Sequence, residues 1–201
     1  MHKRFSSVMV VDVEGHAAMK RATGAQVMAI AEEVPALSSG KDPTDPDDIG
    51  WEPVPVDRVL HDGDDVTLGD VTMHAVLTAG HTRGCTSWTT TVRDRGRSYS
   101  VVILCVPQAA AGVRLLGNPL QPTVADDLAR SLRVLKALRP DIYLDGHPEE
   151  ILAGKIDRLR AGAQPNPLVD PAGYRTYLAE CEADLQHRLQ VERSAAAPAR
   201  R

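Results

Sequence analysis

The chain has 201 residues, of which 43% are hydrophobic, 25% are charged and only 3% are aromatic, a composition typical of one globular domain with an aliphatic core. The net charge of −4, with basic residues scattered among acidic ones, argues against nucleic acid as a main partner. No apolar run approaches the roughly 20 residues that a membrane span needs, so we expect no membrane partner.

The first residues do not form an export signal. They begin with basic side chains, but the short apolar stretch that follows runs into Asp12 and Glu14. The chain as written is therefore expected in the cytoplasm. The β-branched residues 6–11 predict a strand, and a helix is predicted from about Gly15 to Thr23.

Residues 34–55 are rich in Pro, Asp, Ser and Gly and predict a long loop. Two strands are then expected on either side of residues 61–65. A two-residue turn at Gly69-Asp70 predicts a hairpin, and a second hairpin is predicted to turn at residues 94–97.

Helices dominate the C-terminal third. Thr123 is a candidate N-cap, with Asp126 in a capping-box position three residues later. The helix that follows has one apolar face and is ended by Pro140; this face is formed by Leu128, Leu132, Leu135 and Leu138.

Two further helices are predicted, from about Pro148 to Ala161 and from Asp170-Pro171 onward, where proline suits the first helical position. The last helix is expected to bury Tyr174, Leu178, Cys181, Leu185 and Leu189. Residues 193–201 are rich in Ala, Pro and Arg and predict a disordered tail.

The three cysteines, Cys85, Cys105 and Cys181, are odd in number and widely spaced. This spacing predicts neither a disulfide framework nor a Cys-x-x-Cys zinc site. Cys105 ends an apolar strand, and we expect it to be a buried structural thiol.

His81 lies in a tight, glycine-flanked segment, residues 78–88, between the apolar strand 71–77 and a second strand starting at Ser87. A histidine at the end of a strand points into a loop, where rigid scaffolds hold ligands and reacting groups. A lone histidine is more often a surface or hydrogen-bonded residue, and we interpret His2, His61, His74 and His187 in that way.

Residues 78–88, Thr-Ala-Gly-His-Thr-Arg-Gly-Cys-Thr-Ser-Trp, resemble the second metal-ligand loop of the metallo-β-lactamase fold, T-P-G-H-T-x-G-x-x-S-W, in particular that of the third subclass of class B metallo-β-lactamases. Further resemblances follow in the family's order at residues 21–25, 56–69, 117–119, 141–147 and 166–174. Together they extend over about residues 15–190. The resemblance implies an α/β fold of αββα type, in which two αβ layers pack face to face.

The family's first metal motif, H-x-H-x-D-H, does not occur in this sequence. Its positions would fall at Ser7, Met9, Val11 and Asp12. The resemblance therefore predicts an N-terminally truncated relative that has the second αβ layer and at most the last strand of the first. We expect a single incomplete domain over residues 1–192, followed by the tail.

The resembled enzymes hydrolyse the β-lactam amide with a zinc-bound hydroxide. The resemblance implies two zinc sites and assigns one ligand to each, His81 to one and His147 to the other. A catalytic zinc needs about three protein ligands, so we expect reduced zinc binding or none that is tight. The resemblance assigns no catalytic residue in this chain. It also implies that the serines with which some relatives bind the substrate are replaced here, near Pro107 and Ala109.

Two hypotheses describe the segment that stands in place of the first metal motif. Under one, its substitute metal ligands are Asp12, Glu14 and His16, which occupy every second position where the motif should deliver its ligands. Under the other hypothesis they form a solvated loop and a first helical turn, where acidic residues suit the helix dipole.

Three functions remain open. The chain is a zinc hydrolase with a small β-lactam-like substrate, impaired or inactive without the first motif. Alternatively, it is a non-catalytic remnant of such an enzyme, or an interaction module that needs a partner chain to supply the missing layer.

We predict that the chain self-associates or is partly molten. Strands such as residues 101–104 would lose part of their cover, and several hundred Å² at roughly 25 cal/mol per Å² is on the order of 10 kcal/mol, comparable to a domain's stability. Light scattering and a thermal scan test this expectation, and a monodisperse monomer with a cooperative transition would contradict it.

Overall fold

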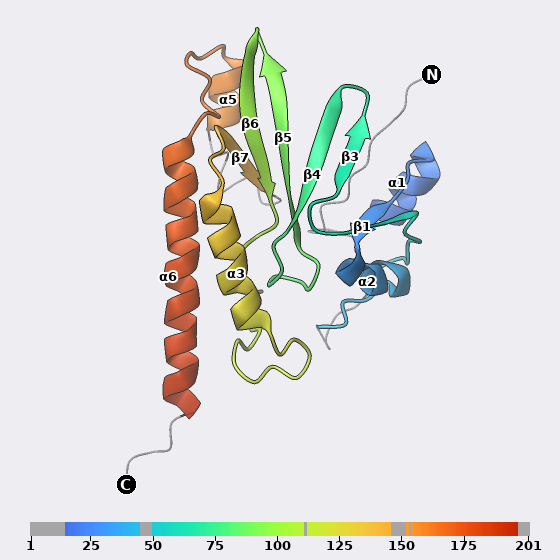
Figure 1. Ribbon diagram of the computed structural model, residues 1–201, viewed down its shortest axis with the longest axis vertical. Helices are drawn as coiled ribbons and strands as arrows, with labels where there is room; N and C mark the ends of the chain where they lie inside the picture. Colours follow the sequence, from blue (N-terminus) through green and yellow to red (C-terminus); the bar gives the residue numbers. More distant parts are fainter. Residues whose placement is uncertain (1–14, 45–49, 111, 146–151, 153, 197–201) are drawn as a thin grey trace.

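The computed structural model describes residues 15–44, 50–110, 112–145, 152 and 154–196 (Figure 1). In chain order the elements are α1 (His16–Thr23), β1 (Met28–Ile30), the 3₁₀ helix η2 (Ala31–Glu33), α2 (Val34–Ser39), β2 (Arg58–Leu60), β3 (Asp65–Leu68), β4 (Val71–Leu77), β5 (Thr86–Asp94), β6 (Arg97–Leu104), α3 (Val124–Ala137), β7 (Ile142–Asp145), α5 (Lys155–Arg160) and α6 (Pro171–Ala196).

These elements form layers around two sheets. The larger sheet has the order β3-β4-β5-β6-β7, and the smaller one pairs β1 with β2 in parallel. Helices α3 and α6 lie on one side of the large sheet, while α1, α2 and β1 lie on the other side (Figure 1). The arrangement agrees with the predicted α/β sandwich, but the described part of the first layer has two strands, not the single strand that was expected.

Both predicted hairpins are confirmed. Strands β3 and β4 pair antiparallel, with Leu68 opposite Val71, so that Gly69 and Asp70 form the turn. Strands β5 and β6 turn at Arg95 and Gly96, whose φ angles are 49° and 80°. Two consecutive positive φ angles are what a type I′ turn requires, and this turn suits the twist of paired strands.

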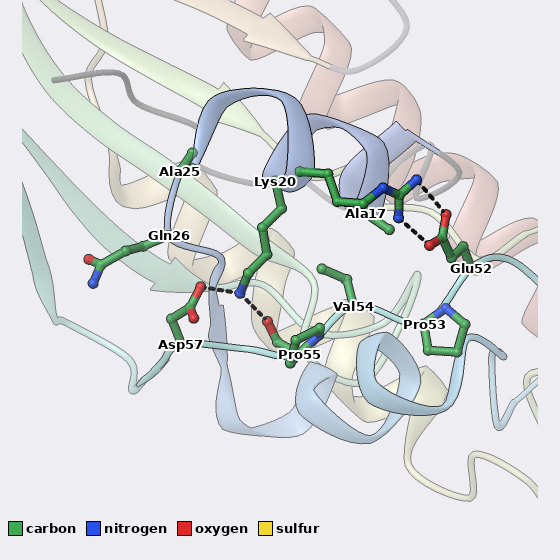
Figure 2. A pocket seen from close by; sticks show the side chains of 11 residues that line it. Ala17, Lys20, Ala25, Gln26, Glu52, Pro53, Val54, Pro55 and Asp57 are labelled. Carbon is green, nitrogen blue, oxygen red and sulfur yellow. Dashed lines mark hydrogen bonds and ion pairs between the residues drawn. The ribbon is translucent and has the colours of Figure 1, made fainter. Parts of the chain in front are cut away.

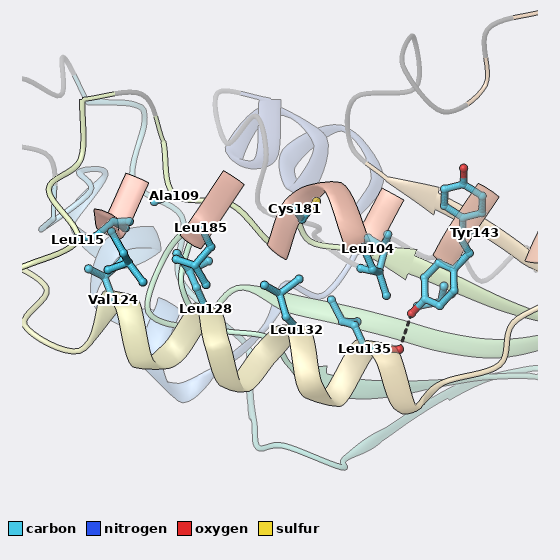
Figure 3. Close-up of a cluster of buried hydrophobic side chains, with 14 residues drawn as sticks. Leu104, Ala109, Leu115, Val124, Leu128, Leu132, Leu135, Tyr143, Cys181 and Leu185 are labelled. Atoms are coloured by element: carbon cyan, nitrogen blue, oxygen red, sulfur yellow. Dashed lines mark hydrogen bonds between the residues drawn. The ribbon is translucent and has the colours of Figure 1, made fainter. Parts of the chain in front are cut away.

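The main core lies between the large sheet and the two long helices (Figure 3). From α3, Leu128, Leu132 and Leu135 are buried, as predicted. Helix α6 buries the predicted residues Tyr174, Leu178, Cys181, Leu185 and Leu189. The Tyr174 hydroxyl donates to the carbonyl oxygen of Leu135 at 2.8 Å, which satisfies the polar end of an otherwise apolar contact between the helices.

The opposite face of the large sheet is covered as well. Trp88, Ala75 and Val66 pack with Leu60 of β2. Further along the sheet, Leu168 and Val169 pack against a cluster formed by Tyr99, Val101 and Ile142. The expectation that residues 101–104 lack cover was therefore wrong at Val101, which is buried beneath a C-terminal loop that the sequence pattern does not connect to it. Self-association stays a prediction.

Three local expectations need correction. Residues 34–39, predicted as loop, form α2, with Pro35 at the start of the helix, where proline is tolerated. Thr123 is at the N-cap of α3, but its hydroxyl donates to the Asp127 carboxylate at 2.7 Å, so no capping box with Asp126 forms. Of the helix predicted from Pro148 to Ala161, the described part agrees with the prediction in α5, from Lys155 to Arg160, and its predicted start lies outside the described residues. Residues 193–196, expected in the tail, continue α6, which their alanines favour.

Cys85 and Cys105 form a disulfide, which corrects the expectation that Cys105 is a free thiol. The register of β5 and β6 places their ends side by side, and the Cα atoms of the two cysteines are 5.7 Å apart, within the range that a disulfide bridges. Cys181 is free and buried, and burial raises its pKa to about 11.

None of the helices in the described ranges combines the length and the apolar character required to cross a membrane.

The side chain of Leu132 is almost fully buried between α3 and α6. We expect Leu132→Ala to lower the free energy of unfolding by about 2–5 kcal/mol, because it removes buried methyl groups and leaves a cavity. Denaturant titration measures this change. Val191→Ala, at a residue 52% exposed on α6, is the matched control and should change stability by less than about 0.5 kcal/mol. Equal effects of the two substitutions would contradict the core described above.

Candidate functional site

The histidine loop, residues 78–85, joins β4 to β5 and is closed by hydrogen bonds at its base. The backbone N–H of Thr78 donates to the carbonyl of Cys85 at 2.8 Å. The hydroxyls of Thr78 and Ser87 are 2.9 Å apart, and Ser87 also accepts the backbone N–H of Cys105 at 3.1 Å. The loop is thereby tied to β6 as well as to its own strands.

Helix α3 supports one side of this loop. The hydroxyl of Ser131 donates to the carbonyl of Ala79 at 2.7 Å. Gly80 has a φ of 141° and packs so closely on the helix that an added Cβ would lie 2.4 Å from a methyl carbon of Leu128. Only glycine meets both demands, because its backbone reaches this φ and it has no Cβ to collide.

Glu33 of η2 supports the opposite side. Its carboxylate accepts the backbone N–H of Gly84 at 2.6 Å, although the residue is only 4% exposed. Burial raises the pKa of Glu33, and the bond from Gly84 opposes that rise. Gly84 is also needed sterically, since an added Cβ would lie 2.5 Å from a side-chain carbon of Glu33.

His81 is half-buried in this loop, and its ring is oriented by the segment that follows β6. Its Nδ1 is 2.8 Å from the carbonyl oxygen of Gln108. Because a carbonyl can only accept, Nδ1 of the neutral ring has the proton, and the lone pair is on Nε2. This is the arrangement in which a histidine serves as a metal ligand, with its other nitrogen held by a carbonyl.

The segment that holds His81 is itself held by α6. The guanidinium of Arg188 donates to the carbonyls of Ala109 and Val113, each at 2.8 Å. Pro107 and Ala109 flank Gln108 and have no side-chain hydrogen-bond donor. The sequence pattern did not indicate Glu33, Gln108 or Arg188, because their partners are between 27 and 79 positions away in the chain.

Of the substitute ligands, only His16 is within the described residues. It begins α1, its Nδ1 is buried without a hydrogen-bond partner, and burial lowers its pKa. Asp12, Glu14 and the second predicted ligand, His147, lie outside the described residues.

The donor set that the structure describes does not fit a catalytic zinc. Within these residues no group of three or more His, Cys, Asp or Glu side chains could hold a metal ion. A catalytic zinc needs about three protein ligands, and the whole sequence contains no H-x-H-x-D-H. No reaction step through a metal follows from this arrangement.

A separate pocket of about 520 Å³ lies between α1 and the extended segment 52–57 (Figure 2). The ammonium of Lys20 donates to the carbonyl of Pro55 at 3.0 Å and pairs with Asp57 at 2.5 Å. Arg21 pairs in the same way with Glu52. Each cation that lines the pocket is thus neutralised by a carboxylate, and no residue of the histidine loop lines it.

No protein-family model matches the chain. Among solved structures, it is similar to a mutant of the metallo-β-lactamase from Legionella gormanii, with 35% identity, a TM-score of 0.85, and coverage of 90% of this chain and 70% of that chain. It is also similar to a subclass B3 metallo-β-lactamase of Bradyrhizobium japonicum, with 34% identity, a TM-score of 0.84, and coverage of 92% and 70%. A class B3 di-zinc metallo-β-lactamase from an Alaskan soil metagenome matches with 27% identity, a TM-score of 0.78, and coverage of 87% and 67%.

The raised pKa of Glu33 predicts a pH-dependent stability. Because the folded protein holds this proton more tightly than the unfolded chain, the associated stability is present below the ordinary pKa of 4.5 and is lost as the pH rises through the folded-state pKa. Glu33→Gln keeps an acceptor for Gly84 and cannot ionise. We therefore expect its melting temperature to match that of the wild type at about pH 4 and to exceed it by a few degrees at about pH 8.

Thermal melts at a series of pH values measure this difference. Glu32→Gln is the matched control, because the carboxylate of this neighbouring residue is exposed to solvent. A Glu33→Gln variant whose stability deficit grows as the pH rises would show that the ionised carboxylate is required at position 33, and a difference that does not change with pH would show that folding does not raise this pKa.

Proposed function

This chain belongs to the metallo-β-lactamase family, among relatives of subclass B3, and we propose that it is a hydrolase of that family in which β-lactam hydrolysis is impaired. The observation that supports the proposal is the histidine loop. It holds one imidazole with Nε2 unprotonated, as a metal ligand requires, while the described residues provide no second and third donor beside it. The scaffold for the chemistry is retained, but its donor set is short.

The substrate class comes from the relatives, whose names state that they are β-lactamases. Hydrolysis of a β-lactam amide needs an activated nucleophile, which in a zinc hydrolase is water held by the metal. One imidazole does not hold zinc against competition from water and cellular chelators. Even with a complete donor set, Pro107 and Ala109 could not donate the side-chain hydrogen bonds that serines would provide to a substrate carboxylate.

A second candidate function is favoured by the small sheet. In the described ranges β1 pairs only with β2, and this sheet has no third strand. The edge of a two-stranded sheet offers backbone donors and acceptors to another chain. A non-catalytic module that binds a partner through this edge is therefore the alternative to an impaired enzyme.

We expect the purified protein to bind fewer than about one equivalent of zinc tightly, because each implied metal site has one recognisable ligand. Metal analysis after exhaustive dialysis measures the stoichiometry, with His81→Ala as the control that removes the oriented imidazole. Two retained equivalents would contradict the prediction and would indicate Asp12, Glu14 or His16 as ligands.

We expect no turnover of a chromogenic cephalosporin above background. In the described ranges no serine hydroxyl is hydrogen-bonded to a histidine, so we expect no substitute nucleophile of the serine–histidine type. The assay should include the Bradyrhizobium japonicum enzyme at equal concentration as a positive control. Turnover that His81→Ala abolishes would refute impairment and establish the chain as an active hydrolase.

A further inference from the structure

A small cavity lies between the two sheets, behind the histidine loop. It is lined by β1, by Glu33 and Gly84, and by Thr86 and Trp88 of β5. The centre of a water molecule can move within a volume of about 10 Å³ in this cavity. A cavity needs roughly 10–15 Å³ by this measure to hold one water, so the space suits a single water molecule and nothing larger.

Two buried polar groups line this cavity. Trp88 is 3% exposed, and its indole Nε1–H has no acceptor in the described part of the chain. Glu33 is similarly buried, and its carboxylate accepts the Gly84 N–H, with the buried Thr82 hydroxyl beside it as a second group that lowers its pKa. Buried donors and acceptors are almost always paired, with protein or with an ordered water, because an unpaired one has lost its hydration without compensation.

We propose that this cavity is a binding site for one water molecule, which joins the Trp88 indole to the Glu33 carboxylate and makes Glu33 the positioning residue of the histidine loop. The water oxygen accepts the Trp88 Nε1–H, and one water hydrogen is donated to the Glu33 carboxylate, whose two oxygens can accept more bonds than Gly84 and Thr82 provide. Thr86 offers a third partner, since its hydroxyl donates to the carbonyl of Gly84 at 2.7 Å and keeps its lone pairs for acceptance. Three hydrogen bonds are typical of a buried water.

The network connects three segments that are distant in the sequence. Glu33 belongs to η2 in the first layer, Gly84 to the histidine loop and Trp88 to the large sheet. Gly84 is three residues from His81, so a fixed Gly84 limits the conformations of the loop that holds the imidazole. This inference goes beyond the proposed function and depends on neither zinc binding nor hydrolysis.

Several neighbouring groups affect the pKa of Glu33, which the Thr82 side chain and the Gly84 N–H lower. The carboxylates of Glu32 and Asp42 act in the same direction as burial. On the histidine loop, Arg83 donates to the carbonyl of Leu120, and the His81 ring is held by Gln108. Neither of these two side chains is paired with Glu33.

Nuclear magnetic resonance of the full chain, labelled with ¹⁵N, tests the water site. The protein has two tryptophans, Trp51 and Trp88, so Trp51→Phe identifies the Trp88 indole resonance by elimination. We expect that resonance to exchange slowly with solvent and to show a cross-peak to a long-lived water, with the sign of a slowly tumbling contact. A fully protected indole with no water cross-peak would overturn the proposal.

A pH titration of the same resonance tests the link to Glu33. We expect the indole shift to change with a midpoint above that of an ordinary glutamate, to lose this change in Glu33→Gln, and to keep it in Glu32→Gln. An unaltered titration in Glu33→Gln would show that the indole does not sense Glu33 and would overturn its positioning role. If Glu33→Gln does not fold, the wild-type water cross-peak still decides the proposal.

Discussion

The pairing of β5 with β6 in one register is the constraint on which the histidine loop depends. Seven paired positions run from Trp88 opposite Ile103 to the turn that joins the strands. This register brings Cys85 to Cys105 and delivers the carbonyl of Gln108 to the ring of His81. A slip of one residue would turn Trp88 to the other face of the sheet and break both links, so the hydrophobic pattern of the sheet also determines the geometry of the loop.

Glu33 is a buried polar group that costs folding stability and at the same time holds the histidine loop in place. Burial raises its pKa, which means that the ionised carboxylate is less stable there than in water. In return the carboxylate fixes a backbone N–H of the histidine loop from the side opposite α3. With the Ser131 hydroxyl on Ala79, the loop is held from both layers. This two-sided support requires the small sheet, which places η2 beside the loop.

Orienting one histidine and holding a metal ion have different physical requirements. Orienting His81 needs only packing and hydrogen bonds to backbone groups, which the sheet, α3 and α6 provide. Holding a catalytic zinc needs several donors within bonding distance of one point, and each missing donor removes a large share of the affinity. The fold of the relatives and the orientation of His81 can therefore be preserved independently of the remaining donors of a metal site.

The sequence by itself determined the local features. Turn residues predicted both hairpins, and leucine spacing predicted the buried faces of α3 and α6, because these depend on residues a few positions apart. The motif around His81 indicated the family and one ligand. Only the tertiary structure decided the Cys85–Cys105 disulfide, the support by Glu33 and Gln108, and the burial of Val101 beneath Leu168 and Val169. Each of these joins segments distant in the chain, and such contacts follow from register and layer packing, which no local pattern encodes.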